Sequence, residues 1–305
     1  MEKINKLKKL FSYYNLDGYI VTKNDEFFGE YIPENKDKLK FISNFSGSYG
    51  FALILKSKNY LFVDGRYTLQ AKIQSGKFFN IVTIPNKFPS DILKGKKLKI
   101  GFDPKLYTQK ALKIFFNKTK CKLLPINQNL IDKIWIKNEN INLKKFYILP
   151  KKAVGQNYRL KINKLVNVLN KKKIDLQFIS ASENIAWLLN IRGKDSEFTP
   201  IPNAYLTLDS NKRINLFCNL NKVESSFKKK FKNIKFIDIK YTNIYLAKIK
   251  NKKILIDSSS CSIYFENILK KNNKIIEFVD PIYFLKSIKS KIEIKNTIKS
   301  HICDG

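Results

Sequence analysis

The feature that most constrains the fold of this 305-residue chain is the alternation of short apolar runs with helical patterns, which occurs in two successive series. In the first series the runs are GYIVT, FALIL, YLFVD, NIVTI and KLKIGFD, at residues 18–22, 51–55, 60–64, 80–84 and 97–103. Such runs, bounded by Gly, Asp and Asn, predict short buried strands. Helical periodicity at the N-terminus and after residue 66 completes the pattern of an α/β domain.

The second series follows the polar, aperiodic stretch IKNENINLKKFYILPKK. Residues 158–170 have helical spacing, and LQFIS, AYLTL, INLFC, KFIDI and KILID predict further strands as far as residue 257. We therefore expect a first domain at 1–136, a linker at 137–152, a second domain at 153–285 and a separate helix at 286–305. The two halves show no evident internal sequence repeat.

The helix expected after LQFIS has recognisable end signals. Ser180 and Glu183 have the spacing of a capping box at its start, and Gly193 stands where a C-terminal cap is expected. Arg192 would then lie in the last helical turn, where a cation is favourable, and it is interpreted as a capping and packing residue. Trp187, in the same helix, is expected to pack in the core.

The chain is strongly basic, with 59 Lys and Arg against 25 Asp and Glu, a formal net charge of +34. Lys, Asn and Ile are abundant together and all have A/T-rich codons, so coding bias explains the excess. The lysines are scattered, and no zinc-finger spacing, RNA-binding sheet motif or basic heptad array accompanies them. We therefore expect no specific nucleic-acid partner, although non-specific binding to polyanions at low salt is expected.

The sequence also bears on location. No apolar run approaches the roughly 18 residues of a membrane span, and MEKINKLKKLF lacks the apolar stretch of a signal peptide. The four cysteines are far apart and lack metal-ligand spacing. We expect a cytoplasmic protein without a membrane segment.

Arginine is used sparingly in this chain: of the 59 basic residues only Arg66, Arg159, Arg192 and Arg213 are arginine. Arg66 lies in FVDGRYTLQA, where Asp64 is a plausible N-cap and Gly65 turns the chain into a helix. A cation in the first helical turn is disfavoured by the macrodipole, so an acidic group is expected nearby. Two interpretations stay open: an ion pair between domains, or a guanidinium that hydrogen-bonds a substrate carbonyl or carboxylate.

Several segments carry a resemblance that spans the chain. YIPENKDKLKFISNFSGSYGFALILKSKNYLFVDGRYTLQAKIQ, GFDP (101–104) and NLIDKIW (129–135) resemble the first domain of three-domain Xaa-Pro aminopeptidases of the creatinase/prolidase superfamily. ENIAWLLNIRGKDSEFTPIPNAYLTL (183–208) resembles their second domain, and SKIEIKNTIKSHICDG resembles the first helix of their third. The resemblance implies two consecutive creatinase N-terminal-like domains, each a mixed β-sheet flanked by helices.

The same resemblance implies which parts are missing. In the family, two Asp, one His and two Glu of a third, pita-bread domain hold two divalent, manganese-type metals, and this domain is expected to be absent here. The single histidine, His301, lies in the leading helix. We therefore expect no catalytic residue, metal ligand or cofactor in this chain, and no activity of the chain alone. Phe27 stands near a place where relatives often have histidine, and the role of that imidazole is not carried over.

The resemblance implies substrate contacts as well. The arginine of this turn reaches toward the bound peptide in the family, so Arg66 is the expected substrate-binding residue, supported by Asp64, Gly65 and Tyr67. Tyr67 and Leu69 are expected to anchor the following helix. The implied partners are peptides with proline at the second position, a second copy of the chain in a homodimer, and a separate catalytic domain.

Three functions stay open at this point. The first is the non-catalytic N-terminal region of an Xaa-Pro aminopeptidase, which shapes the substrate entrance and helps dimerisation. The second is a free-standing peptide- or protein-binding module without peptidase activity. The third is a basic protein that binds polyanions through its charge.

Overall fold

The computed structural model describes residues 1–137 and 143–305, and the chain divides into two compact units, 1–140 and 141–305. Part of the linker expected at 137–152 therefore lies outside the described residues. No helix within the described ranges is long and apolar enough to cross a membrane.

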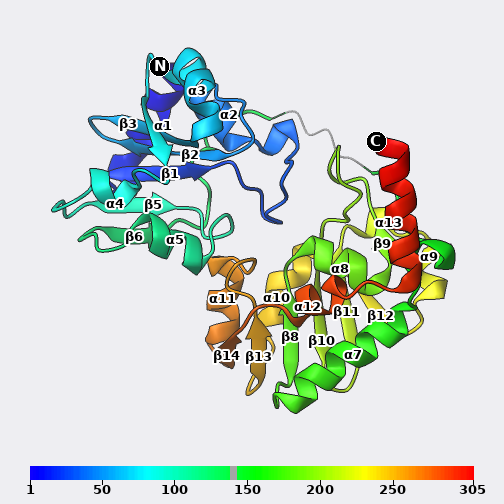
Figure 1. The fold of residues 1–305 in the computed structure, drawn as a ribbon. Helices are drawn as coiled ribbons and strands as arrows, with labels where there is room; N and C mark the ends of the chain where they lie inside the picture. The colour runs from blue at the N-terminus through cyan, green and yellow to red at the C-terminus, as the bar shows by residue number, and fades with distance from the viewer. Residues whose placement is uncertain (138–142) are drawn as a thin grey trace. The chain divides into compact units, whose positions relative to one another are not determined.

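The first unit is built on a six-stranded mixed sheet (Figure 1). Its strands are β1 Gly18–Thr22, β2 Gly50–Leu55, β3 Asn59–Asp64, β4 Asn80–Ile84, β5 Lys99–Phe102 and β6 Lys122–Pro125. Its helices are α1 Glu2–Tyr13, α2 Lys38–Ser43, α3 Thr68–Ser75, α4 Pro89–Ile92 and α5 Gln109–Phe115, with 3₁₀ turns η1 Glu34–Lys36 and η2 Gly65–Tyr67.

The strands of this sheet are ordered β4-β3-β2-β1-β5-β6. Only β2 runs antiparallel to its neighbours, so the carboxyl ends of the other five strands meet at one edge. Apolar residues of α1, α2 and α3 pack on one face of the sheet, among them Phe11, Leu39 and Ala71. On the other face Phe51 of β2 stacks on Phe115 of α5 at 4.2 Å between ring centroids. Helices therefore cover both faces, as in other α/β folds.

The second unit contains a six-stranded mixed sheet and a two-stranded sheet (Figure 1). Its strands are β7 Tyr147–Ile148, β8 Leu176–Ile179, β9 Ile191–Arg192, β10 Ala204–Asp209, β11 Ile214–Cys218, β12 Ile234–Asp238, β13 Lys253–Ile256 and β14 Lys274–Glu277. Its helices are α6 Lys151–Val154, α7 Tyr158–Lys171, α8 Ser182–Leu189, α9 Ser225–Lys230, α10 Thr242–Ala247, α11 Ile263–Lys270, α12 Pro281–Ser287 and α13 Lys291–Asp304, with 3₁₀ turns η3 Leu220–Lys222 and η4 Ile239–Tyr241.

The large sheet of the second unit repeats the topology of the first. Its order is β12-β11-β10-β8-β13-β14, and β10 takes the place of β2 as the strand antiparallel to both neighbours. Matching strand ends carry matching side chains: Asp17 before β1 accepts from the backbone N–H of Lys99, and Asp175 before β8 accepts from that of Lys253. The expected fold class, two consecutive mixed-sheet domains flanked by helices, is confirmed, and the two domains share one topology despite their dissimilar sequences.

The end signals predicted for the helix after LQFIS, a capping box at Ser180 and a cap at Gly193, are wrong. Ala181, not Ser180, precedes α8, and no side-chain cap bond forms; the Ser180 hydroxyl lies 3.0 Å from that of Ser260 instead. The helix ends at Asn190, which adopts the left-handed conformation with φ 58°. Asn tolerates this conformation through local hydrogen bonding, so a glycine cap three residues later is unnecessary. Gly193 serves another purpose: a Cβ there would lie 2.7 Å from Cα of Pro202.

Arg192 consequently lies in β9 and not in a helix. Its partner strand, β7, lies within the range expected to be a linker, and Tyr147 pairs with Arg192. A two-residue strand inside the short run FYIL, which Lys145 and Pro150 bound, has too little periodicity to stand out in a sequence. The β7–β9 pair joins this part of the range to the second unit.

Candidate functional site

The candidate site lies where β3 ends, at the edge where the five carboxyl ends of the first sheet meet. In open α/β sheets ligands bind outside the carboxyl ends of the strands. Asp64 closes β3 in an extended conformation, and its side chain caps η2 by accepting from the backbone N–H of Arg66 at 2.9 Å. The N-cap expected at Asp64 is confirmed, and it places Arg66 in the first turn.

The Arg66 guanidinium is exposed, with 75% of its side chain accessible to solvent. It forms two contacts with Asp64, from Nη2 to Oδ2 at 2.6 Å and from Nε to Oδ1 at 3.2 Å. The hydrogen bond from the Arg66 side chain lowers the pKa of Asp64. The acidic partner expected for this cation is therefore its own capping residue. Within the first unit the pair is a surface contact of the kind that adds little to stability.

The second unit provides an internal comparison for this turn. Asn219, directly after β11, takes the place that Asp64 has at the end of β3, and its side chain accepts from the backbone N–H of Asn221 at 3.0 Å. Strand register places Asn221 where the first unit has Arg66. The same strand-to-turn geometry thus forms without an acidic cap and without a cation. The fold therefore does not require the Asp64–Arg66 pair.

Tyr67 joins this turn to the glycine-serine-rich segment FSGSYG (45–50), which leads into β2. Its hydroxyl lies 2.6 Å from that of Ser48, and its ring meets Phe45 edge-on at 5.8 Å. A Cβ at Gly47 would lie 2.3 Å from the Phe45 ring, so the tight path of this segment requires glycine there. Tyr67 therefore anchors the turn as expected.

The expectation that Leu69 anchors the following helix is wrong. Its side chain is 72% exposed, whereas Ala71 and Ser75 are the buried residues of α3. The 3₁₀ turn η2 delays the start of the α-helix to Thr68 and rotates the buried face accordingly.

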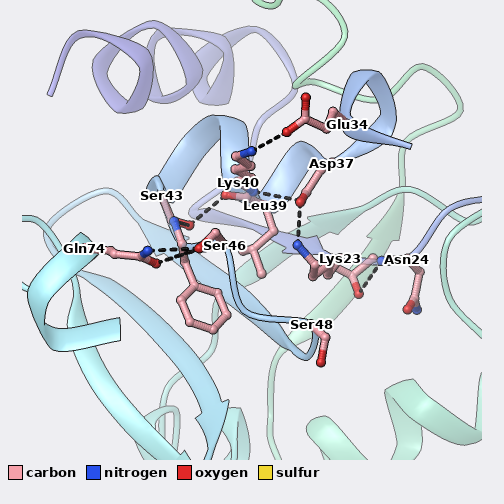
Figure 2. A network of polar contacts seen from close by, with 12 residues as sticks. Lys23, Asn24, Glu34, Asp37, Leu39, Lys40, Ser43, Ser46, Ser48 and Gln74 are labelled. Atoms are coloured by element: carbon pink, nitrogen blue, oxygen red, sulfur yellow. Dashed lines mark hydrogen bonds and ion pairs between the residues drawn. The ribbon is translucent and has the colours of Figure 1, made fainter. Parts of the chain in front are cut away.

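A polar network also contacts the glycine-serine-rich segment (Figure 2). Gln74 of α3 accepts from the backbone N–H of Ser46 at 3.0 Å and donates to its hydroxyl at 2.9 Å. Asp37 caps α2 through the backbone N–H of Lys40 and forms a buried ion pair with Lys23 just after β1. The network therefore ties the ends of β1 and β2 to the helices beside Arg66.

Phe27, which stands near the place of a family histidine, is buried at this same edge. Its backbone N–H donates to the buried Asp25 carboxylate at 3.0 Å, and the Lys36 ammonium lies 5.3 Å from its ring centroid. Burial raises the pKa of Asp25. Phe27 thus has a packing role, and an aromatic ring without ring nitrogens offers no proton transfer.

One side chain of the site was missed in the sequence. Tyr49 is half exposed beside this turn, and both its burial and the charge of Asp64 raise the pKa of its hydroxyl. Its phenol is a hydrogen-bonding group close enough to Asp64 to sense its charge. A single tyrosine in a Ser-Gly-rich loop gives no sequence signal that distinguishes it from an ordinary loop residue.

Peptidase chemistry in the family depends on side chains that hold two metal ions. Over residues 1–137 and 143–305 no three His, Cys, Asp or Glu side chains are grouped to hold a metal ion. His301 is exposed on α13. These residues do not fit a two-metal peptidase centre, which needs a set of ligands to activate water.

Comparisons with known proteins agree with the two-domain architecture. Two family models, each described as the creatinase/prolidase N-terminal domain, match residues 3–134 and 137–293. The chain is 31% identical to the Xaa-Pro aminopeptidase ApepP of Drosophila melanogaster over 309 aligned positions, which cover 95% of this chain and 50% of that protein. It is 30% identical to Xaa-Pro aminopeptidase 1 of Dictyostelium discoideum, over 100% of this chain and 51% of that one.

A solved structure shows the same fold. The crystal structure of an X-prolyl aminopeptidase from Caenorhabditis elegans, described as a cytosolic enzyme with a di-nuclear active site, superposes with a TM-score of 0.87 at 22% identity. The superposition covers 98% of this chain and 53% of that one. The chain thus spans about half the length of the curated relatives it matches.

Proposed function

This chain belongs to the creatinase/prolidase N-terminal domain family, and on that premise we propose that it is the N-terminal region of an Xaa-Pro aminopeptidase. In this role it contributes no catalytic group. It shapes the entrance for peptides with proline at the second position and places Arg66 against the bound peptide. We further propose that it works in the cytoplasm and forms a homodimer as part of the complete enzyme.

The observation that carries the proposed substrate contact is the difference between two equivalent turns. The turn after β11 forms with Asn219 and Asn221, whereas the turn after β3 carries an exposed guanidinium aligned by Asp64. Alignment by a carboxylate leaves Nη1 directed away from the pair and available for a carbonyl or carboxylate. Charge-assisted hydrogen bonds of this kind are among the stronger polar contacts in proteins.

The proposal is tested with a hybrid in which residues 1–305 replace the matching half of the Drosophila melanogaster relative. We expect the hybrid to release the N-terminal residue from a peptide with proline at the second position when manganese is supplied. The 305-residue chain alone, with manganese at the same concentration, is expected to release none. A folded hybrid without activity would favour a free-standing binding module, and manganese-dependent release by the purified chain alone would contradict the non-catalytic role.

A further inference from the structure

The second unit contains a cavity of about 330 Å³ that the proposed function does not use. Its walls come from α6, α7, α8, β9 and α13, the C-terminal helix drawn in red in Figure 1. Part of its lining is apolar, with Leu149 and Val154, and part is polar, with Lys161, Trp187, Arg192 and Glu293. Trp187 and Arg192 belong to the segment WLLNIRG, which carries part of the family resemblance. The substrate contact proposed at Arg66 assigns no role to this segment.

Lys161 is a buried cation with neutral partners. The residue is 1% exposed, and its ammonium donates to the backbone carbonyl of Trp187 at 2.9 Å and to Oδ1 of Asn190 at 2.6 Å. The ammonium also lies 4.1 Å from the centroid of the Trp187 ring. Neither acceptor carries a charge, and burial lowers the pKa of Lys161 to about 8. A buried charge of this kind is stabilised when an anion approaches it.

Two further side chains of the lining have donors without a close acceptor. Arg192 uses Nη1 for the backbone carbonyls of Ala186 and Ile191, at 3.1 and 2.8 Å. Its Nε and Nη2 donate no hydrogen bond to any residue in the described ranges. The buried indole N–H of Trp187 has no close hydrogen-bond partner among the residues described, although it interacts with the Glu293 carboxylate. The Arg192 nitrogens are not buried away from solvent, so a ligand in the cavity can reach them. Buried donors are nearly always satisfied in proteins, so the indole N–H calls for a close acceptor.

Glu293 does not supply the missing negative charge in full. Burial alone would raise the pKa of Glu293, but its hydrogen bonds with Ser290, the charge of Lys161 and an interaction with the Trp187 indole lower it overall. One carboxylate oxygen accepts from the backbone N–H of Ser290 at 2.8 Å and so caps α13. Lys161, Arg192 and Lys289 also line the cavity, so three cations face one anion that is already engaged in capping.

We propose that this cavity binds a small oxyanion, a carboxylate or a phosphate group, through the Arg192 guanidinium, the Trp187 indole N–H and the Lys161 ammonium. The planar fork of arginine matches the two oxygens of such a group. The apolar part of the lining at Leu149 and Val154 accommodates the carbon part of a carboxylate ligand, whereas phosphate alone would leave it unfilled. The proposal is independent of Arg66 and of any peptidase activity, because every residue it uses lies in the second unit.

Titration calorimetry of the 305-residue chain tests the proposal, with sodium phosphate and sodium acetate as separate probes at constant ionic strength. We expect saturable binding of at least one anion with a Kd of about 1 mM, an affinity reasonable for a few hydrogen bonds to one small ion. Saturation by acetate alone would assign a carboxylate ligand, and saturation by phosphate alone would assign a phosphate group. No saturable binding of either anion would overturn the proposal.

Matched variants separate the cavity from the basic surface. Arg192→Gln is expected to weaken binding at least about tenfold, as loss of a charge-assisted contact should. Arg159→Gln removes the same charge from the exposed face of α7 and is expected to leave the affinity unchanged. Equal weakening by both variants would show diffuse attraction to the +34 chain and would refute the site.

Two more measurements keep the test decisive if Arg192→Gln disturbs the end of α8. Trp187→Phe removes the indole N–H and keeps an aromatic ring, and it is expected to weaken binding several-fold while the chain stays folded. In a Trp135→Phe background Trp187 is the remaining tryptophan, and its fluorescence should change with the same saturation curve. Unchanged binding in Trp187→Phe together with unchanged fluorescence would place the anion elsewhere.

Discussion

At the scale of single residues, Asp64 has two tasks in the turn at the end of β3: it caps the turn through the backbone N–H of Arg66 and it orients the Arg66 guanidinium. In the second unit Asn219 caps the equivalent turn, where Asn221 stands in the place of Arg66. Capping is therefore separable from orientation by substitution at residue 64.

Substitution of Asp64 is predicted to show this separation. Asp64→Ala should lower the free energy of unfolding by about 1 kcal/mol, because the cap is lost, whereas Asp64→Asn should cost only a few tenths. Urea denaturation of the isolated chain measures both values. Equal losses in the two variants would mean that the ion pair with Arg66, rather than the cap, stabilises the turn.

Lys161 gives the stability of the second unit an unusual pH dependence. Its pKa is about 8 in the folded chain and near the ordinary value of 10.5 in the unfolded chain. Between these values the unfolded chain binds more protons, so the free energy of unfolding should rise with pH in this window. Below the window Lys161 is protonated in both states and contributes no slope.

The matched comparison is between Lys161→Met and Lys164→Met, the latter an exposed lysine of the same helix. Urea denaturation from about pH 7 to about pH 10 should show the rise in wild type and Lys164→Met and a smaller rise in Lys161→Met. If all three chains share one pH slope, Lys161 keeps its ordinary pKa and is not buried as a cation.

At the scale of elements, Asp280 connects three parts of the second unit. Its Oδ1 accepts from Gln177 of β8 at 2.8 Å and from the backbone N–H of Ile282 at 2.9 Å, and its Oδ2 accepts from Asn184 of α8 at 2.7 Å. Burial raises the pKa of Asp280, which lies at the start of α12. The side chain thus joins a strand and two helices.

Asp280→Ala is predicted to lower the free energy of unfolding by about 3 kcal/mol, because it removes a cap and leaves buried amide donors unsatisfied. Glu224→Ala is the matched control, since Glu224 precedes α9 with an exposed side chain that forms no cap bond. Chemical denaturation compares the two. A loss for Asp280→Ala no larger than that of the control would show that the network does not hold α12 in place.

The elements also show how far the sequence could be interpreted. The central strands were predicted within one or two residues, because β1, β2 and β10 are apolar along nearly their whole length. The edge strands β6 and β14 were missed, since they are half exposed and flanked by lysine. Charged, short edges protect a sheet from pairing with other chains, and the same property hides them in a sequence.

The candidate site was predictable in part. An arginine in a lysine-rich chain marked the turn, and Asp64 was identified as its cap. The helix boundary at Thr68 and the exposure of Leu69 were not predictable, because a 3₁₀ turn shifts the helical phase without a sequence signal. The cavity around Lys161 arises from β9 and α13, which lie about a hundred residues apart in the chain and meet only in the folded unit.

At the scale of the whole molecule, two units of one topology have diverged in what they carry at equivalent places. The first has an oriented cation at the carboxyl edge of its sheet, and the second has a neutral turn there and a basic cavity elsewhere. Divergence of this kind between two copies of a fold is expected when function resides in the sites and not in the fold. The central claim is therefore that Arg66 serves substrate and not structure.

The most direct measurement of this claim is the peptide kinetics of Arg66 variants in the hybrid with the Drosophila melanogaster catalytic half, together with the melting temperature of the same variants in the isolated chain. Arg66→Ala should lower kcat/KM for a peptide with proline at the second position by about 10- to 100-fold, the loss of one charge-assisted hydrogen bond. Arg66→Lys should recover part of it, since the fork is gone but the charge remains. Arg159→Ala is the control and should change neither quantity.

The melting temperature of the isolated Arg66→Ala chain should stay within about 2 °C of wild type, as for an ordinary surface substitution. A clear drop in melting temperature with unchanged kcat/KM would contradict the account and make Arg66 a structural ion-pair partner.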